Sequence, residues 1–320
     1  MAKSTRLYVV SDLHAAEGAW RKLLNAIKLN IYQADAVLLA GDLTGKAMVP
    51  IYQTDGGYEA ELLGVRQKAR GDTELPALQR AIADVGYYSF VTTVDEGKRL
   101  NDDPAARGAL FHRLMSDRME AWLTLANEHL AGVSTPLYIM PGNDDDFVID
   151  PILDRDGWIT INANEKVLDI PGGFQLASMG WSSPTPWHTP RELPEEEFLD
   201  KLSVLVAPIH DYQKAIFMTH VPPFDSGLDT APMLDRTLRP TVSMGDVLRG
   251  PVGSTGVRSA IEKFKPLVGV HGHIHESGGH RKVGSTLCVN SGSEANHGIL
   301  RGYLVDISGQ GVERAIRVEG

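Results

Sequence analysis

Seven short apolar runs along the chain are typical of strands buried inside a sheet. They occupy residues 7–10, 36–40, 136–140, 174–180, 214–219, 266–270 and 286–290. Helix-like stretches lie between some of them, and the stretch from Leu110 to Leu130 repeats apolar residues at helical spacing. A second such stretch, from Ala19 to Leu29, follows the first predicted strand. Strands that alternate with helices predict an α/β layered domain.

Two regions interrupt this alternation. Residues 44 to about 110 form a long excursion, in which MVPIYQ, TDGG and YEAELLG predict a hairpin with a Gly-rich turn, followed by a helical segment. Residues 181–200 form a loop rich in Pro, Trp and Ser that leads into a helix. Long excursions in α/β enzymes often shape the active site, and surface decoration is an equal alternative for the first one. We therefore expect one domain over residues 1–320, with an insertion at about 44–110.

The composition is that of an ordinary globular protein, with 42% hydrophobic and 22% charged residues among 320. No apolar run approaches the roughly 20 residues needed to cross a bilayer. The first predicted strand is followed at once by the polar SDLH, which is unlike a signal peptide. The single cysteine, Cys288, lies in an apolar run and is expected to be a buried thiol. These features favour a cytoplasmic protein without a membrane partner.

The net charge of −10 is unfavourable for a large contact with nucleic acid, which needs a basic surface. It does not exclude a small phosphorylated substrate, because bound divalent cations make a site locally positive on an acidic protein. The charge therefore argues against a nucleic-acid scaffold and leaves an enzyme open.

Residue types that bind metals stand directly after five of the predicted strands. In chain order they are Asp12 and His14, Asp42, Asn143 and Asp144, His220, and finally His271, His273 and His275. In open α/β sheets ligands bind beyond the carboxyl ends of the strands, so we expect these side chains to converge there. Carboxylate, imidazole and amide groups together suit Mn, Fe or Zn better than Mg or Ca. Because these motifs lack thiolates, a structural zinc cluster is excluded.

The order of these motifs resembles the calcineurin-like metallophosphoesterase superfamily. Its signature runs DxH, GD, GN[H], H and GHxH. The chain has it as Asp12-Leu-His14, Gly41-Asp42, Gly142-Asn143, His220 and Gly272-His273-Ile-His275. Each motif alone would be weak, but their order, spacing and strand context together are specific. The resemblance implies a four-layer α/β/β/α sandwich with two facing mixed sheets.

The resemblance also implies a site for two transition-metal ions, Mn, Fe or Zn. Asp12, His14 and His275 would hold the first ion, Asn143, His220 and His273 the second, and Asp42 would bridge both. Such ions clamp the phosphoryl oxygens and lower the pKa of a bridging water, which attacks phosphorus without a covalent phosphoenzyme. The implied activity is hydrolysis of a phosphoester bond in a small phosphorylated substrate.

One residue departs from the family pattern. The commonest third motif has a His after the Asn, which contacts the phosphate and assists the leaving group, whereas this chain has Asp144. An ionised carboxylate is a poor acid, and it repels a dianionic monoester more than a monoanionic diester. Family members without this His often act on diesters, so we expect a phosphodiesterase with Asp42, Asn143 and Asp144 as catalytic residues. A phosphomonoesterase and an inactive protein-binding scaffold are the alternatives, and a double-strand-break-repair type of nuclease is disfavoured.

Several further residues have two interpretations. His188, in the Pro-rich loop, joins Asn143 as a candidate substrate-binding residue and is a candidate for the missing acid; the alternative is an exposed loop histidine. We expect His271 to pack beside the site rather than to bind metal. Asp145 and Asp146 either orient the histidine ligands or are solvated loop carboxylates.

Two glycine-containing segments and two tryptophans complete the set of candidates. GDLTGK (41–46) fails the P-loop spacing and is followed by Ala47 where Ser or Thr would hold magnesium, so we reject a nucleotide-binding loop. NSGSE (290–294) follows a strand, resembles the NPGS turn of the family and is expected to position backbone near the site. Trp181 and Trp187 either stack on a ring of the substrate or anchor the Pro-rich loop to the body.

Overall fold

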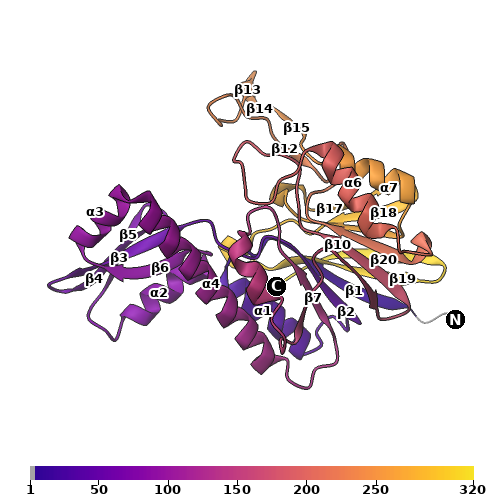
Figure 1. Cartoon of the computed structure of the whole chain (residues 1–320). Helices are drawn as coiled ribbons and strands as arrows, with labels where there is room; N and C mark the ends of the chain where they lie inside the picture. The colour runs from indigo at the N-terminus through magenta and orange to yellow at the C-terminus, as the bar shows by residue number, and fades with distance from the viewer. Residues whose placement is uncertain (1–3) are drawn as a thin grey trace.

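Two six-stranded sheets face each other in the computed structural model, which describes residues 4–320 (Figure 1). The order in the first sheet is β20 (Gly311–Glu319), β19 (Arg301–Ser308), β1 (Thr5–Val10), β2 (Ala36–Ala40), β7 (Leu137–Met140) and β8 (Thr160–Asn162). The order in the second is β17 (Gly279–Val283), β18 (Thr286–Asn290), β16 (Val268–His271), β11 (Ala215–Thr219), β10 (Phe174–Met179) and β9 (Lys166–Ile170). Both sheets are mixed. The first is antiparallel at the β20–β19–β1 end and parallel from β1 to β8, and the second is parallel in the centre with an antiparallel pair at each edge. All seven predicted strands are confirmed.

Helices cover the outer face of each sheet. The first sheet carries α1 (Glu17–Lys28) and α4 (Pro104–His129), and the second carries α6 (Glu195–Val206) and α7 (Thr255–Phe264) (Figure 1). Three hydrophobic cores lie between these layers. In the core under α1 and α4, the indole rings of Trp20 and Trp122 stack with centroids 4.8 Å apart. The predicted four-layer α/β/β/α sandwich is confirmed.

Alternation along the strands assigns each side chain to a layer. In β1, Leu7 and Val9 enter the core between the sheets, whereas Tyr8 and Val10 enter the core under the helices. Because the central strands are buried on both faces, their sequences are continuous apolar runs rather than alternating ones. Polar side chains can therefore gather only where these strands end.

The first excursion is a module with a sheet and a core of its own. The sheet has the order β5 (Val65–Ala69), β4 (Gly57–Leu62), β3 (Met48–Thr54) and β6 (Tyr88–Thr92), accompanied by α2 (Leu75–Asp84) and α3 (Val94–Asp102). Val49, Ile51 and Ile82 belong to its buried core. The module stands at one end of the sandwich in Figure 1. We call residues 48–102 the inserted module.

The inserted module ends earlier in the chain than the sequence pattern indicated. Helix α4 begins at Pro104, where Asp103 Oδ1 accepts the N–H of Ala106 at 2.9 Å, and runs unbroken to His129 in the body. The predicted boundary at about 110 therefore lies inside one helix. The first turns of α4 are exposed, so the apolar repeat that indicates a helix starts only further along.

Short elements connect these parts. They are η1 (Phe147–Ile149), α5 (Asp150–Leu153), η2 (Tyr212–Lys214), η3 (His275–Ser277) and η4 (Ala295–His297). A narrow arm projects from the body in Figure 1 and contains β12 (Thr230–Pro232), β13 (Val242–Ser243), β14 (Asp246–Val247) and β15 (Arg249–Pro251). Within residues 4–320, no helix combines the length and the apolar character that crossing a membrane requires.

Candidate metal centre

The chain turns sharply where the parallel strands end. Asp12, His14, Asp42 and His273 have φ angles of 55°, 46°, 54° and 67°, in the left-handed region that residues other than Gly rarely occupy. Such conformations cost of the order of 1–3 kcal/mol each and persist only where the surrounding structure holds them. The backbone at this edge of the sheets is therefore shaped to place particular side chains.

A first group of polar atoms comes from Asp12, His14, Asp42 and His275, and these atoms all lie within 4.8 Å of one another. The Nε2 atoms of His14 and His275 are 3.0 Å apart, and Asp12 Oδ1 lies 3.4 Å from His275 Nε2. Asp42 Oδ2 is 3.5 Å from His14 Nε2. Two imidazole nitrogens and two carboxylates that face one point form a donor set for one cation.

Asp42 also belongs to a second group, together with His220 and His273. Asp42 Oδ1 lies 3.2 Å from His220 Nε2. The amide oxygen of Asn143 is 3.0 Å from His220 Nε2 and 2.7 Å from His273 Nδ1. The two oxygens of the Asp42 carboxylate thus face different groups, as a residue shared by two ions requires. All seven predicted ligands are brought together here: Asp12, His14, Asp42, Asn143, His220, His273 and His275.

Hydrogen bonds outside the two groups orient the ligands. Nδ1 of His220 lies 2.8 Å from the carbonyl oxygen of Ala40, which turns Nε2 toward the site. The amide nitrogen of Asn143 donates to Thr189 Oγ1 at 3.0 Å and to Asp144 Oδ1 at 3.1 Å. The amide oxygen of Asn143 is therefore left to face the histidines. These ligand atoms are held in place by the protein itself.

Burial and neighbouring charges set the protonation of these groups. Burial lowers the pKa of His14 and of His273 to about 3, so both imidazoles are neutral at pH 7, as metal ligands must be. Burial raises the pKa of Asp42 to about 6. Burial also acts to lower the pKa of His220, but the adjoining Asp42 carboxylate outweighs it and raises that pKa to about 10. His220 therefore carries a proton that partly balances the buried carboxylates.

Two glycines let the ligand loops approach one another closely. A Cβ atom at Gly142 would collide with Asp42 Oδ1, and one at Gly272 would collide with Asp12 Oδ2. The donor set is thus closely packed, and it mixes neutral imidazoles, buried carboxylates and an amide oxygen in two groups. This chemistry fits two transition-metal ions such as Mn, Fe or Zn.

Asp145 supports the site in a way that the sequence did not reveal. Its buried carboxylate accepts hydrogen bonds from the N–H groups of Leu43, Thr44 and Gly142 at 3.0, 2.8 and 2.7 Å. It also accepts the hydroxyl of Thr44 at 2.6 Å, so it ties the loop after β2 to the loop after β7. The side chain of Asp146 caps η1. The interpretation that these two carboxylates orient the histidine ligands is therefore wrong, and the alternative of a solvated loop carboxylate is wrong for Asp145, which is fully buried.

Arg191 is a second supporting residue, and no sequence pattern marked it. Its buried guanidinium donates to the carbonyl oxygen of Asp145 at 2.7 Å and to Asp150 Oδ1 at 2.5 Å. The backbone N–H of Arg191 donates to the carbonyl oxygen of Asn143 at 3.2 Å. Its guanidinium carbon also lies 4.4 Å from the ring centroid of Phe147. These contacts fasten the Pro-rich loop to the loop that carries Asn143.

Asp144 and Lys46 form the open side of the site. Asp144 Oδ2 lies 2.5 Å from Lys46 Nζ, and the N–H of Asp144 donates to Asp42 Oδ1 at 3.1 Å. The side chains of Lys46 and Asp144 are 52% and 16% exposed, whereas those of Asp12 and His220 are fully buried. Burial acts to lower the pKa of Lys46, but the nearby carboxylates outweigh it and the pKa lies above its usual value. Lys46 is therefore a cation at the open side of the site.

Other candidates lie around the site. The ring of His188 is exposed and makes no hydrogen bond within residues 4–320, although Thr189 beside it contacts a ligand. The role of His188 in substrate binding stays a prediction. Trp181 anchors its loop through a hydrogen bond from its indole N–H to Glu165 Oε1 at 2.6 Å. Trp187 is 63% exposed, so the anchoring interpretation holds for only one of the two tryptophans.

His271 and the NSGSE turn behave as predicted. His271 lies fully buried outside both groups, with Nδ1 3.0 Å from the carbonyl oxygen of Thr219, and burial lowers its pKa to about 4. In the turn, Ser293 Oγ donates to the carbonyl oxygen of Asp12 at 2.6 Å. The turn therefore positions the backbone of the first ligand loop. Cys288 is buried, as expected.

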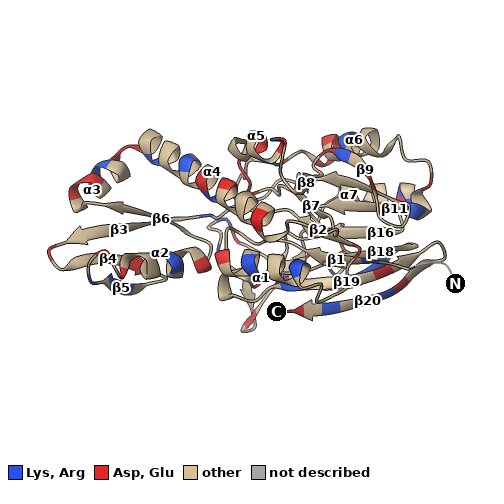
Figure 2. Ribbon diagram, turned by 90° about the horizontal axis from the view of Figure 1, so that it is seen from below, with Lys and Arg blue, Asp and Glu red and all other residues tan. Residues whose placement is uncertain are grey.

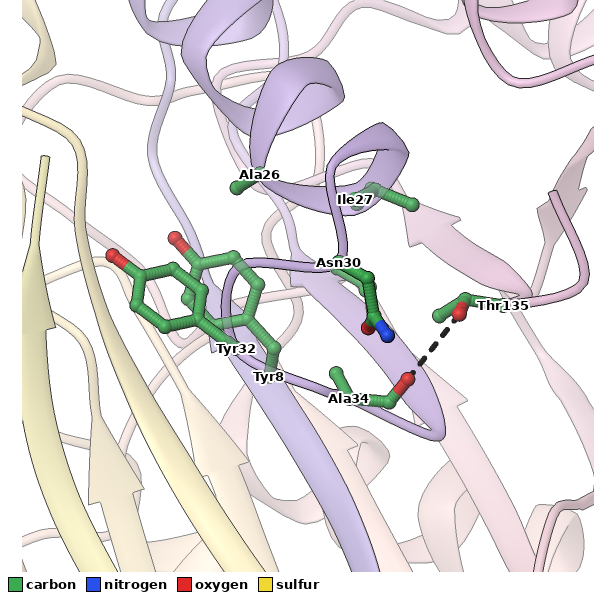
Figure 3. Close-up of a pocket in the computed structure, with 8 residues that line it drawn as sticks. Tyr8, Ala26, Ile27, Asn30, Tyr32, Ala34 and Thr135 are labelled. Carbon is green, nitrogen blue, oxygen red and sulfur yellow. Dashed lines mark hydrogen bonds between the residues drawn. The ribbon is translucent and has the colours of Figure 1, made fainter.

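A small hollow lies away from this site, beneath α1 (Figure 3). It is lined by Tyr8, Ala26, Ile27, Asn30, Tyr32, Ala34, Val37 and Thr135. Thr135 Oγ1 donates to the carbonyl oxygen of Ala34 at 3.2 Å across one side of it. Ala34 and Thr135 precede β2 and β7, so the hollow lies at the amino ends of these parallel strands, whereas ligands bind at the carboxyl ends. It is a packing feature rather than a second site.

Comparison with known proteins assigns the family. The sequence model of the calcineurin-like phosphoesterases matches residues 5–277, which is most of the chain. The chain therefore belongs to the calcineurin-like phosphoesterase family, whose members hydrolyse phosphoester bonds. The match spans all five ligand motifs, so the family and the geometry of the site agree.

One protein is similar in sequence, and two solved structures are similar in fold. Uncharacterized protein MJ1162 of Methanocaldococcus jannaschii is 29% identical over 167 residues, which cover 51% of this chain and 67% of that protein. The crystal structure of TT1561 of Thermus thermophilus is similar over 99% of both chains, with a TM-score of 0.52 and 14% identity. Another solved structure matches over 99% of both chains with a TM-score of 0.56, also at 14% identity. At such low identity these structures show the fold alone.

Proposed function

We propose that this protein is a metal-dependent phosphodiesterase that acts on small phosphorylated molecules. The observation that carries the proposal is the complete ligand set in two groups that share Asp42, beside an Asp144 where the family more often has a histidine. When bound, two transition-metal ions neutralise the charge of the phosphoryl oxygens and lower the pKa of the water that acts as nucleophile.

The residues of the site divide this work. Asp42 faces both groups and fixes how far apart they lie. Asn143, whose amide is oriented by Thr189, presents an oxygen to the second group. Asp12 and His220 are fully buried, so bulk water is kept away from this part of the site and the electrostatic interactions there are stronger. Because water is the nucleophile, no side chain has to form a covalent intermediate.

The preference for diesters follows from the charge at the open side. A histidine in place of Asp144 would add as much as one positive charge, whereas the paired Asp144 and Lys46 together add none. Having Asp144 instead of a histidine therefore removes positive charge from the site, and a dianionic monoester loses more electrostatic attraction than a monoanionic diester does. Burial acts to raise the pKa of Asp144, but Lys46 outweighs it and the pKa lies below its usual value. Asp144 is therefore unsuited to protonate a leaving group.

Nucleic acid and a purely structural role fit the protein less well. The net charge is −10, and Figure 2 shows basic and acidic residues mixed along α4 and β20. A duplex backbone is bound by clustered basic residues instead. An inactive scaffold would have no need for every ligand position to be filled. These points support a small phosphodiester as the substrate.

A screen of diesters and monoesters with Mn, Fe, Zn and Ni tests the proposal. We expect bis(p-nitrophenyl) phosphate to be hydrolysed at least about ten-fold faster than p-nitrophenyl phosphate, which corresponds to roughly 1.4 kcal/mol of charge discrimination. Asp42→Ala serves as the inactive control. Faster hydrolysis of the monoester would favour a phosphatase, and a protein that retains no metal in elemental analysis would favour the scaffold.

A further inference from the structure

In the proposed function Lys46 only balances the charge of Asp144 and makes no contact with the substrate. It follows β2 in the loop that carries Asp42, and its Nζ lies 2.5 Å from Asp144 Oδ2. An ammonium group has three N–H donors, and Asp144 is its only partner within residues 4–320. Two N–H donors of Lys46 are therefore free to bind a molecule at the candidate metal centre. The half-exposed side chain keeps that position accessible.

The inserted module holds the backbone of Lys46 in place. The N–H of Gly45 donates to Tyr88 Oη at 2.7 Å, and the N–H of Tyr88 donates to the carbonyl oxygen of Ala47 at 2.9 Å. Tyr88 in β6 therefore holds the residues on both sides of Lys46. Gly86, in the turn before β6, also packs against Gly45 so closely that a Cβ on Gly45 would not fit. The inserted module therefore fixes the backbone position from which the Lys46 side chain extends.

Asp144 completes the positioning of Lys46. Its own N–H is bonded to Asp42 Oδ1, and its Oδ1 accepts the amide N–H of Asn143, so the carboxylate is fixed relative to both ligand groups. The remaining oxygen holds Lys46 Nζ. Alone, Asp144 would repel any phosphate at the site, and the pairing with Lys46 removes this repulsion.

We propose that Lys46, held by Asp144 and by the inserted module, is a substrate-binding cation that donates hydrogen bonds to an anionic non-bridging oxygen of a phosphodiester at the site. The inference rests on the proposed function. It gives Asp144 the task of holding a cation, and it gives the inserted module a part in substrate binding. A lysine is a point-like charge on a flexible stem, which suits one phosphate oxygen rather than a bidentate clamp.

Replacement of Lys46 by Met tests this inference, with Lys98→Met as the matched control, because Lys98 is an exposed lysine of α3 in the inserted module. The probes are dimethyl phosphate, a diester with poor leaving groups, and inorganic phosphate, with binding measured by calorimetry on the metal-loaded protein. We expect Lys46→Met to weaken binding of dimethyl phosphate about 10- to 100-fold, as the loss of one hydrogen bond to a charged group does. Lys46→Arg should restore part of it, and Lys98→Met should change nothing.

The metal content of Lys46→Met should equal that of the unchanged protein, and its melting temperature should fall by no more than about 4 °C, because Lys46 is half exposed and its pairing with Asp144 contributes little to stability. Binding within two-fold of the unchanged protein, at normal metal content, would overturn the role of Lys46 and leave the phosphodiesterase proposal standing. If the unchanged protein hydrolyses only monoesters, the phosphodiesterase proposal fails. The inorganic phosphate measurements then still decide whether Lys46 binds a phosphate oxygen.

A double-mutant cycle tests the part assigned to the inserted module. Tyr88→Phe removes the hydroxyl that accepts the N–H of Gly45 and should weaken dimethyl phosphate binding about two- to five-fold. In the Lys46→Met background the same change should have no further effect, because the hydroxyl acts through Lys46. An equal loss in both backgrounds would show that Tyr88 does not act through Lys46.

Discussion

The site has a floor and a rim that are built differently. The floor is Asp12, Asp42, Asn143 and His220, which are at most 3% exposed, and the rim is Lys46, Asp144 and His188, which are partly or fully open to solvent. The floor residues directly follow strands of the sandwich. The rim residues depend on the inserted module and on the Pro-rich loop that Arg191 fastens. The residues of the candidate metal centre are therefore positioned by the two sheets, whereas the residues proposed to contact the substrate are positioned by the loops around them.

The two parts also differ in energy. Buried carboxylates cost several kcal/mol each unless they are compensated. Here Asp12 accepts the N–H of His273 at 3.0 Å, Asp42 accepts that of Asp144 at 3.1 Å, and His220 supplies a positive charge. The Lys46–Asp144 pair at the rim is partly exposed and contributes about 1 kcal/mol or less to stability. Changes in the floor should therefore alter metal binding and stability, and changes in the rim should alter substrate binding alone.

The largest effect is expected for Asp42→Ala, because among the described residues Asp42 is the carboxylate common to both ligand groups. Hydrolysis should fall by about 1,000-fold or more, and the dinuclear complement of metal should be lost. Elemental analysis and steady-state kinetics provide the measurement. Retention of two ions with normal activity would contradict the shared role of Asp42 and with it the description of the floor.

Asp145→Ala should come next, because it leaves three backbone N–H groups without their partner. We expect the free energy of unfolding to drop by about 3–5 kcal/mol and metal affinity to weaken about 10- to 100-fold. Urea denaturation and metal titration measure the two quantities. Asp146→Ala is the control and should cost about 1 kcal/mol, as the loss of a cap does. Equal effects of the two variants would remove Asp145 from the support of the floor.

A smaller effect is expected from pH. The pKa of His220 is raised from 6.5 to about 10 in the protein without ions, so its contribution to stability is full below pH 6.5 and is lost as pH rises toward 10. Metal binding must displace this proton, so metal affinity should rise by at least about ten-fold per pH unit between pH 6.5 and 8.5. The difference in melting temperature between metal-loaded and metal-free protein should widen over the same range. A difference that is constant with pH would show that no proton is displaced.

The smallest effect is expected for His188→Ala at the rim. Its ring is exposed and makes no hydrogen bond within the described residues, so kcat/KM for a diester should fall by less than about three-fold, as for a surface change. Steady-state kinetics across pH provides the test. A large loss in kcat together with loss of the high-pH limb of the profile would instead make His188 the acid that protonates the leaving group.

The floor could be predicted because its information is local. AVLLA is a strand buried on both faces, and the next two residues, Gly41 and Asp42, have to turn and to carry the polar group. The same relation of apolar run and polar end places His220 after β11 and His273 after β16. The alternation of strands and helices predicted only an α/β layered domain, and the resemblance of the motifs to a known family implied the four-layer sandwich.

The rim could not be predicted, because its contacts join segments that are distant in the sequence. The sequence alone determined the strands, the residues that meet at the candidate metal centre and the exclusion of a P-loop at GDLTGK, but it assigned no partner to Lys46. Only the tertiary structure placed Lys46 against Asp144, buried Arg191 beneath the Pro-rich loop and bonded Asp145 to two ligand loops. Such contacts depend on which loops the two facing sheets bring together, and a single polar residue in a loop carries no periodic pattern that reports its neighbour.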